Sequence, residues 1–271
     1  MTTTTTSVWA RWASLTTHDL ASLPRQRAVA ILPVAATEQH GPHLPLSVDT
    51  DLVDGILARA QAAWDGDFPV LVLPTQAVGF SPEHAKFAGT LTLSSETLIR
   101  LWTELADSVY ASGIQKLLIF NSHGGQVGAL DLVARDLRHR HGMQVVSSSW
   151  YQLPLEEEMR AFSAHERRFG VHAGQVETSM MLALQPELVQ MSLAQKFPSS
   201  SEIRAKQTQI LGNGYSAKLA WQAQDLNPSG AVGDAAAADA QAGQALVAKA
   251  ALGLIQLVKD LSGLPQGTLQ G

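Results

Sequence analysis

Residues 31–49 read ILPVAATEQHGPHLPLSVD, and this stretch decides the kind of fold. An apolar run of strand type at residues 28–34 ends abruptly and is followed by four residues that can bind a metal: Glu38, His40, His43 and Asp49. Carboxylates and imidazoles are costly to bury unless another group pairs with them. The pattern therefore favours a shared divalent ion, since oxygen and imidazole ligands suit zinc, manganese and iron. The alternative is a solvated Glu–His pair in an ordinary loop, with Gly and Pro as turn residues.

The chain around this segment alternates apolar strands with helical patterns. Strands are predicted at residues 28–34, 70–74, 116–120 and 143–149, and helices at 49–64, 95–112 and from about 126 to 140. Such alternation predicts βαβ units with right-handed crossovers and a mainly parallel sheet. We therefore expect an α/β fold of one domain, residues 1–271, with helices flanking the sheet.

The second half of the chain is less regular. Residues 150–173 carry a charged stretch that we interpret as a solvated helix face: Glu156, Glu157, Glu158, Arg160, Glu166, Arg167 and Arg168. Residues 174–184 are predicted to be helical. Residues 191–233 are rich in Ser, Gln and Gly and are predicted to form loops, and residues 235–262 are predicted to form a closing helix.

Composition excludes several classes of function. The chain has 271 residues, 45% of them hydrophobic, a net charge of −5 and no cysteine. The absence of a basic run argues against a nucleic-acid or anionic-membrane partner. The absence of cysteine excludes disulfides, thiolate nucleophiles and Cys-ligated zinc. Residues 1–7 do not have the pattern of a signal peptide, and the sequence has no apolar run of the ~18 residues that a membrane span needs, so we expect a soluble cytoplasmic protein.

A second polar cluster, Asn121-Ser-His123-Gly-Gly125, directly follows the strand at 116–120. Ligands of parallel sheets bind outside the carboxyl ends of the strands, so this loop and the Glu38 loop are expected at one edge. His123 could instead cap the following helix. A dinucleotide-binding loop, and with it a nucleotide-dependent oxidoreductase, is disfavoured, because the glycines do not follow G-x-G-x-x-G and residues 147–149 supply no acid.

A third cluster joins His172 to Glu177 at the start of the helix predicted near Gly174. An acid in the first turn also interacts well with the helix dipole, which is the alternative role for Glu177. His84 lies in a long loop after the second strand, and loops of that length in a compact domain are usually functional.

Together these motifs resemble the creatininase (creatinine amidohydrolase) family over about residues 28–190. The resemblance rests on Glu38-Gln-His40-Gly-Pro-His43-Leu-Pro, Asp49, Phe87-Ala-Gly89-Thr, Asn121-Ser-His123-Gly-Gly and His172-x4-Glu177-Thr-Ser. It implies a mainly parallel α/β sheet, a two-metal site and a homohexamer. Carried over, Glu38 and His123 would hold one metal, His40 the other, and Asp49 would bridge them.

The chain departs from creatininase itself at two positions. Where that enzyme has a tyrosine and a metal-binding glutamate, this chain has Gly124 and Gly125. The best replacement ligand is Glu177, and His172 would be the nearby proton-transfer residue, so the catalytic residues are predicted to be His172 and Glu177. The residues predicted to contact the substrate are Ser81, His84, Gly124, Gly125, Trp150 and Tyr151. The Gly-Gly form resembles family members that deformylate pyrimidine intermediates or process peptide precursors.

These observations lead to one functional hypothesis and a rival. We expect an amidohydrolase with two divalent metal ions per chain, zinc or else manganese or iron, that cleaves a C–N bond in a small amide, cyclic amide or formamide. The rival is a non-enzymatic metal-binding or small-molecule-binding protein on the same fold.

Overall fold

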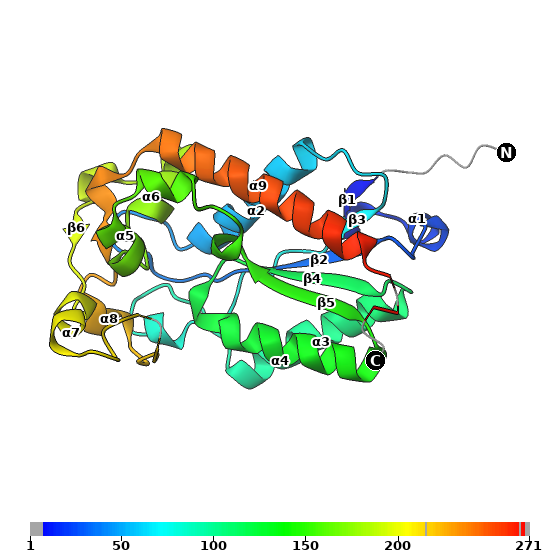
Figure 1. The fold of residues 1–271 in the computed structure, drawn as a ribbon, viewed down its shortest axis with the longest axis horizontal. Helices are drawn as coiled ribbons and strands as arrows, with labels where there is room; N and C mark the ends of the chain where they lie inside the picture. Colours follow the sequence, from blue (N-terminus) through cyan, green and yellow to red (C-terminus); the bar gives the residue numbers. More distant parts are fainter. Residues whose placement is uncertain (1–7, 215, 266, 269–271) are drawn as a thin grey trace.

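A five-stranded parallel sheet forms the centre of the molecule (Figure 1). The computed structural model describes residues 8–214, 216–265, 267 and 268, so the expectation for residues 1–7 lies outside the described part. The order of the strands is β1-β3-β2-β4-β5, and every pair is parallel. The strands are β1 (Trp9–Arg11), β2 (Val29–Val34), β3 (Val70–Val72), β4 (Lys116–Asn121) and β5 (Gln144–Ser149). The predicted mainly parallel α/β fold is confirmed, and β1 is a strand that the sequence pattern did not predict.

Helices cover both faces of the sheet because successive side chains of a strand point to opposite faces. Along β2, Val29 and Ile31 pack into one hydrophobic core, whereas Ala30 and Leu32 pack into the other. On the first face lie α2 (Val48–Ala62), α6 (Gln175–Leu184) and α9 (Ala240–Gly263), and on the second lie α3 (Ser95–Ala111) and α4 (Val127–His141) (Figure 1). These five helices confirm the predicted helical segments to within a few residues.

The register of β2 and β4 positions the functional loops. Val34, the last residue of β2, pairs with Asn121, the last residue of β4. The two loops that carry Glu38 and His123 therefore leave adjacent strands at the same edge, as the parallel topology predicted.

Short elements occupy the remaining segments. The helices are α1 (Thr17–Ser22), α5 (Ala164–Phe169), α7 (Ser201–Gln207) and α8 (Ala223–Leu226), and β6 (Lys196–Phe197) pairs with β7 (Gly233–Asp234) in an antiparallel pair. Single 3-10 turns are η1 (Trp12–Ser14), η2 (Pro82–His84), η3 (Gly124–Gln126), η4 (Trp150–Gln152), η5 (Glu158–Ala161), η6 (Pro186–Leu188), η7 (Met191–Leu193) and η8 (Ala235–Ala237).

Two sequence expectations are corrected here. Residues 191–233 are not loops throughout, since they include β6, α7 and α8. The charged stretch at 156–168 is not one solvated helix face, because it is divided between η5 and α5, and Glu166 is buried. Its carboxylate accepts hydrogen bonds from backbone N–H groups, which compensates the cost of burial. Among the described residues no helix is both long and apolar enough to cross a membrane.

Candidate metal centre

Five segments that are distant in sequence bring acidic and histidine side chains together at the carboxyl edge of the sheet. The loop after β2 supplies Glu38 and His40, α2 supplies Asp49, the loop after β4 supplies His123, the segment 172–177 that leads into α6 supplies His172 and Glu177, and η2 supplies Glu83 and His84. Within this cluster, three overlapping groups have ligand atoms that all lie within 4.8 Å of one another: Glu38–His40–His172, Glu38–Glu83–His123 and His40–Asp49–Glu177.

His40 presents one ring nitrogen to two carboxylates. Its Nδ1–H donates to the Glu38 carbonyl at 3.1 Å, so the lone pair is on Nε2. The Nε2 atom lies 3.9 Å from Asp49 Oδ1 and 4.0 Å from Glu177 Oε2. Ligand atoms on one tetrahedral zinc ion are separated by roughly 3.3–3.6 Å. A shift of a few tenths of an ångström would therefore bring these three atoms around one ion.

Glu177 also makes a contact outside this group. Its Oε2 atom accepts a hydrogen bond from the backbone N–H of Ala173 at 2.5 Å. Ala173 lies just before α6 and has a φ of 53°, a conformation that is uncommon for a residue with a side chain. The acid at the start of α6 therefore combines a structural contact with a position beside His40.

His123 faces Glu38 and the second oxygen of Asp49. Its Nε2–H donates to the Phe80 carbonyl at 3.0 Å, which leaves Nδ1 as the nitrogen that faces the carboxylates. The Nδ1 atom lies 3.2 Å from Glu38 Oε1 and 3.4 Å from Asp49 Oδ2. These distances are close to those that separate two ligand atoms on one zinc ion. Asp49 thus has one oxygen near His40 and the other near His123, which is the geometry of a bridging carboxylate.

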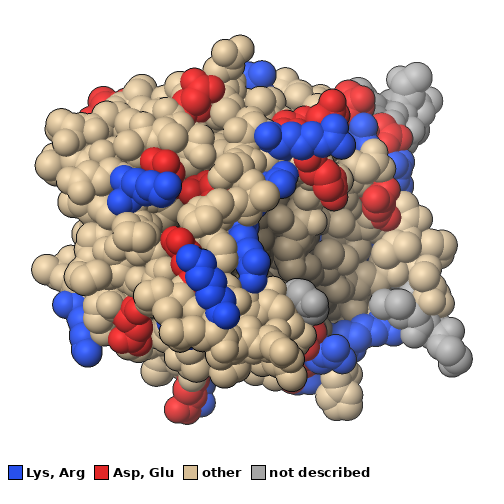
Figure 2. Space-filling view, turned by 60° about the vertical axis from the view of Figure 1, so that its left-hand side comes forward, with Lys and Arg blue, Asp and Glu red and all other residues tan. Residues whose placement is uncertain are grey.

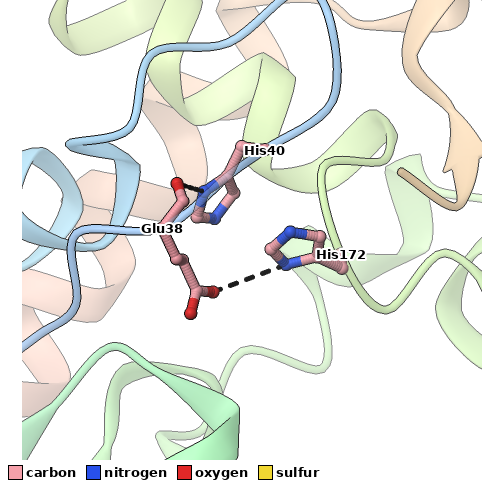
Figure 3. Close-up of side chains that lie close together, drawn as sticks. All are labelled: Glu38, His40 and His172. Atoms are coloured by element: carbon pink, nitrogen blue, oxygen red, sulfur yellow. Dashed lines mark hydrogen bonds and ion pairs between the residues drawn. The ribbon is translucent and has the colours of Figure 1, made fainter. Parts of the chain in front are cut away.

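His172 has the same arrangement. Its Nε2–H donates to the Gln39 carbonyl at 2.7 Å, and its Nδ1 lies 3.8 Å from Glu38 Oε1. Figure 3 shows the His172 ring and the His40 ring on the same side of the Glu38 carboxylate. Three imidazoles are therefore each bound to a backbone carbonyl through one ring nitrogen and face the carboxylates with the other, which is how metal-binding histidines are usually held.

His84 is oriented the other way by Gln39. The Gln39 Oε1 atom accepts from the Gly41 N–H, so its Nε2 donates, to the Gly230 carbonyl at 3.0 Å and to His84 Nδ1 at 2.7 Å. The proton of His84 is then on Nε2, which lies 3.4 Å from Glu38 Oε1. His84 therefore contributes a donor to the cluster, whereas His40 and His172 contribute acceptors.

Burial sets the charge of most of these groups. It lowers the pKa of His40 well below its usual range and that of His84 to about 3, and it also lowers the pKa of His172, so these rings are neutral near pH 7. Burial opposes the protonated form of His123, but the neighbouring Glu38 and Asp49 outweigh it and raise its pKa well above 6.5.

The carboxylates repel one another because they lie close together in a buried site. Burial, followed by the charge of Glu38, raises the pKa of Asp49 to about 7. Burial, followed by the charge of Asp49, raises the pKa of Glu177 to about 8. For Glu38 burial is outweighed by His123 and His84, and its pKa is lowered. Cations between these groups would relieve the repulsion.

The residues present fit divalent metal ions. Glu38 Oε2, His40 Nε2 and Asp49 Oδ2 are buried and make no hydrogen bond with any described residue. Native proteins rarely leave buried polar atoms without partners, so each such atom calls for an explanation such as an ion. The donors are imidazole nitrogens and carboxylate oxygens, which suit zinc, manganese or iron.

The structure also locates the other predicted site residues. Ser81 is buried, and its Oγ lies 3.2 Å from His123 Nε2. Tyr151 is 42% exposed, and its pKa, raised mainly by burial, also responds to the charges of His123 and Asp49. Trp150 is buried in the hydrophobic core and contacts the ring of Tyr151 edge-to-face. The substrate-contacting roles of these residues stay predictions.

His43, part of the opening motif, belongs to a different environment. Its Nε2 contacts Thr178 Oγ1 at 2.9 Å, and its ring stacks on Phe197. None of the candidate metal groups among the described residues includes it. The expectation that it shares the metal with Glu38, His40 and Asp49 is not supported.

Sequence reasoning missed three residues of the cluster's surroundings. Glu83 and Gln39 are sequence neighbours of His84 and His40, but no spacing rule distinguishes them from ordinary loop residues. Trp221, from the irregular segment after α7, lies edge-on to His84 with ring centroids 6.4 Å apart. Figure 2 turns the end of the molecule that carries β6, α7 and α8 forward and shows a hollow there whose visible wall is mostly uncharged.

Comparisons of this chain with known proteins agree on one family. Residues 13–258 match the creatininase family, described as creatinine amidohydrolase. The mycofactocin precursor peptide peptidase of Mycobacterium ulcerans (strain Agy99) is 34% identical over 187 residues, which cover 65% of this chain and 66% of that protein. The creatinine amidohydrolase of Pseudomonas putida is 28% identical over 64% of this chain and 70% of its own length. The match thus spans just under two thirds of the mycofactocin relative.

Solved structures agree on the fold. A mutant creatininase of Zn-Zn type superposes with a TM-score of 0.74 at 22% identity, covering 95% of this chain and all of that chain. A creatininase structure with Mn gives a TM-score of 0.69 at 21% identity over 95% of this chain and all of the other. Because the family match extends over most of the chain, the protein belongs to the creatininase family.

Proposed function

We propose that this protein is a metal-dependent hydrolase that uses two divalent ions to cleave a C–N bond in a small amide, cyclic amide or formamide. The observation that carries the proposal is the buried cluster in which His40 and His123 each direct a ring nitrogen toward a different oxygen of Asp49. Glu38 and His123 would hold one ion, His40 and Glu177 the other, with Asp49 between them. When bound, such a pair of ions supplies a hydroxide near neutral pH and polarises the substrate carbonyl.

The protein's own residues supply the proton transfer. His172 is buried beside Glu38, and its Nδ1 is free to accept a proton because Nε2–H is bound to the Gln39 carbonyl. The ring can take a proton from the attacking water at Nδ1 and pass it to the leaving nitrogen. His84 donates from Nε2 toward Glu38 and so keeps that carboxylate in place.

The substrate class follows from positions 124 and 125, where this chain lacks the side chains that creatininase carries. A Cβ atom on Gly124 would meet no atom within 4 Å, so we expect the site to accept a substrate of different shape from creatinine. The relative named as a peptidase of the mycofactocin precursor is more similar in sequence than the creatinine amidohydrolase, which supports including short peptides among the candidates. We propose a homohexamer on family grounds.

The test is metal-dependent hydrolysis by the purified protein. Metal content is measured first, and the protein is then assayed on cyclic ureas, lactams, imides, formamides and short peptides. The proposal expects activity that disappears with a chelator and returns with zinc, manganese or iron. Two bound ions with no turnover of any C–N substrate would instead favour the non-enzymatic binding protein.

A further inference from the structure

Gly125 leaves a space that the carboxylate of Glu83 occupies. A Cβ atom built on Gly125 would overlap Glu83 Oε1 and would also lie too close to His123 Nε2. A Cβ atom on the preceding Gly124 would meet no atom within 4 Å. A side chain at position 125 and the observed position of Glu83 are therefore mutually exclusive, whereas position 124 is unconstrained.

The Glu83 carboxylate lies beside the metal centre. Its side chain is 13% exposed, and its Oε1 atom lies 3.6 Å from His123 Nε2, so the carboxylate must turn toward Nδ1 to share an ion with that ring. One of its oxygens lies within 4.8 Å of both a Glu38 oxygen and a His123 ring nitrogen. Among the described residues no lysine or arginine forms an ion pair with it. Its charge consequently faces two other ligand groups and has no cationic partner except the His123 ring.

We propose that Glu83 is a ligand of the ion held by Glu38 and His123, and that residue 125 is glycine to make room for it. This inference rests on the proposed two-metal function. It assigns Glu83 on η2 to the ion next to Glu38, while Glu177 serves the ion next to His40.

The charge of the cluster agrees with this assignment. Four carboxylates converge, those of Glu38, Asp49, Glu83 and Glu177, and the charge of two divalent cations would match theirs. Without Glu83, the ion beside Glu38 would have a single terminal carboxylate in addition to its share of Asp49. Buried charges need such compensation, and unpaired ones are costly.

The experiment measures metal affinity without any substrate. Apo-protein is titrated with Zn²⁺ or Mn²⁺ against a chelator of known affinity, for the full-length wild type and for Glu83→Ala. Removing a group that only orients a metal ligand typically weakens metal affinity by ~10–100-fold. We expect Glu83→Ala to weaken one of the two ions by more than ~100-fold and to leave the other bound.

Two glycine variants form a matched pair. Gly125→Ala should displace the Glu83 carboxylate and weaken the same ion, whereas Gly124→Ala should retain wild-type metal affinity. If both substitutions act by removing the contact between Glu83 and the ion, their effects should not add. The double variant Glu83→Ala/Gly125→Ala should then bind that ion about as tightly as whichever single variant binds it less tightly, except for any loss caused by the new Cβ atom against His123. Should Glu83→Ala fail to fold, Glu83→Gln and Gly125→Ala decide the question.

The outcomes separate this inference from the proposed function. Two ions bound with wild-type affinity in Glu83→Ala, or equal affinities in Gly124→Ala and Gly125→Ala, would overturn the assignment of Glu83. Loss of one ion in Glu83→Ala from a protein that hydrolyses no C–N substrate would support the ligand and refute only the enzymatic proposal.

Discussion

Replacing Glu166 by alanine should destabilise the fold and loosen the segment that carries His172 and Glu177. Glu166 is 2% exposed, and its Oε1 accepts from the backbone N–H of Gln175 at 2.6 Å while its Oε2 accepts from the N–H of Asp234 at 2.8 Å. Gln175 is the first residue of α6 and Asp234 lies in β7. One carboxylate thus holds the start of α6 against β7.

The surrounding glycines show how closely this carboxylate is enclosed. Cβ atoms built on Gly170, Gly174 and Gly233 would each overlap it. A hydrogen bond to a charged group contributes ~1.5–3 kcal/mol, so two amount to about 3–6 kcal/mol. Water can enter the vacated space and bind the freed N–H groups. We therefore take the lower end of this range and expect Glu166→Ala to lower the free energy of unfolding by about 3 kcal/mol. At ~2–4 °C of Tm per kcal/mol for a chain of this size, Tm should fall by about 6–12 °C.

Thermal unfolding followed by circular dichroism measures this loss, with Glu157→Ala as the control. Glu157 has the same charge but is exposed, so its replacement should change stability by less than ~0.5 kcal/mol. Glu166→Gln should fall between the two, since its NH₂ group must face one backbone N–H. The metal content of Glu166→Ala should also fall. A Tm of Glu166→Ala within about 2 °C of the control would refute the argument that this carboxylate fixes the start of α6.

Four further predictions concern the metal centre. Asp49→Ala should lose more metal than any other single change, because one oxygen faces each half of the cluster, and elemental analysis showing two ions per chain would contradict this. Metal affinity should rise as pH increases from 6 to 8, since the protons held by Asp49 (pKa about 7) and Glu177 (pKa about 8) must leave before an ion binds; a flat profile in chelator competition would count against both as ligands. His172→Ala should keep its metals and lose ~10²–10⁴-fold in kcat, with less effect on substrates that have a good leaving group, and loss of a metal would remove it from the catalytic residues. Creatinine should be hydrolysed weakly or not at all, because Gly124 and Gly125 lack the side chains of creatininase, and robust creatine formation would disprove this.

Local patterns in the sequence were sufficient to predict the fold class and to bring the first candidate residues of the cluster together. Alternating apolar strands and helices predicted the parallel sheet, and the topology of such sheets predicted that Glu38 and His123 lie at one edge. The missed strand β1 has three residues, and α8 has four, so neither is long enough to show a clear hydrophobic period.

Tertiary structure alone decided which side chains face one another across these loops. Glu83 and Glu166 are both glutamates in polar segments, and nothing in their neighbours along the chain separates them from the exposed Glu157. Their environments are set by glycines distant in sequence, Gly125 for Glu83 and Gly233 for Glu166, whose missing side chains leave room for a carboxylate. Burial and charge depend on every segment that packs around a group, so the sequence determined the sheet and its polar edge, whereas packing determined which carboxylates became part of the site.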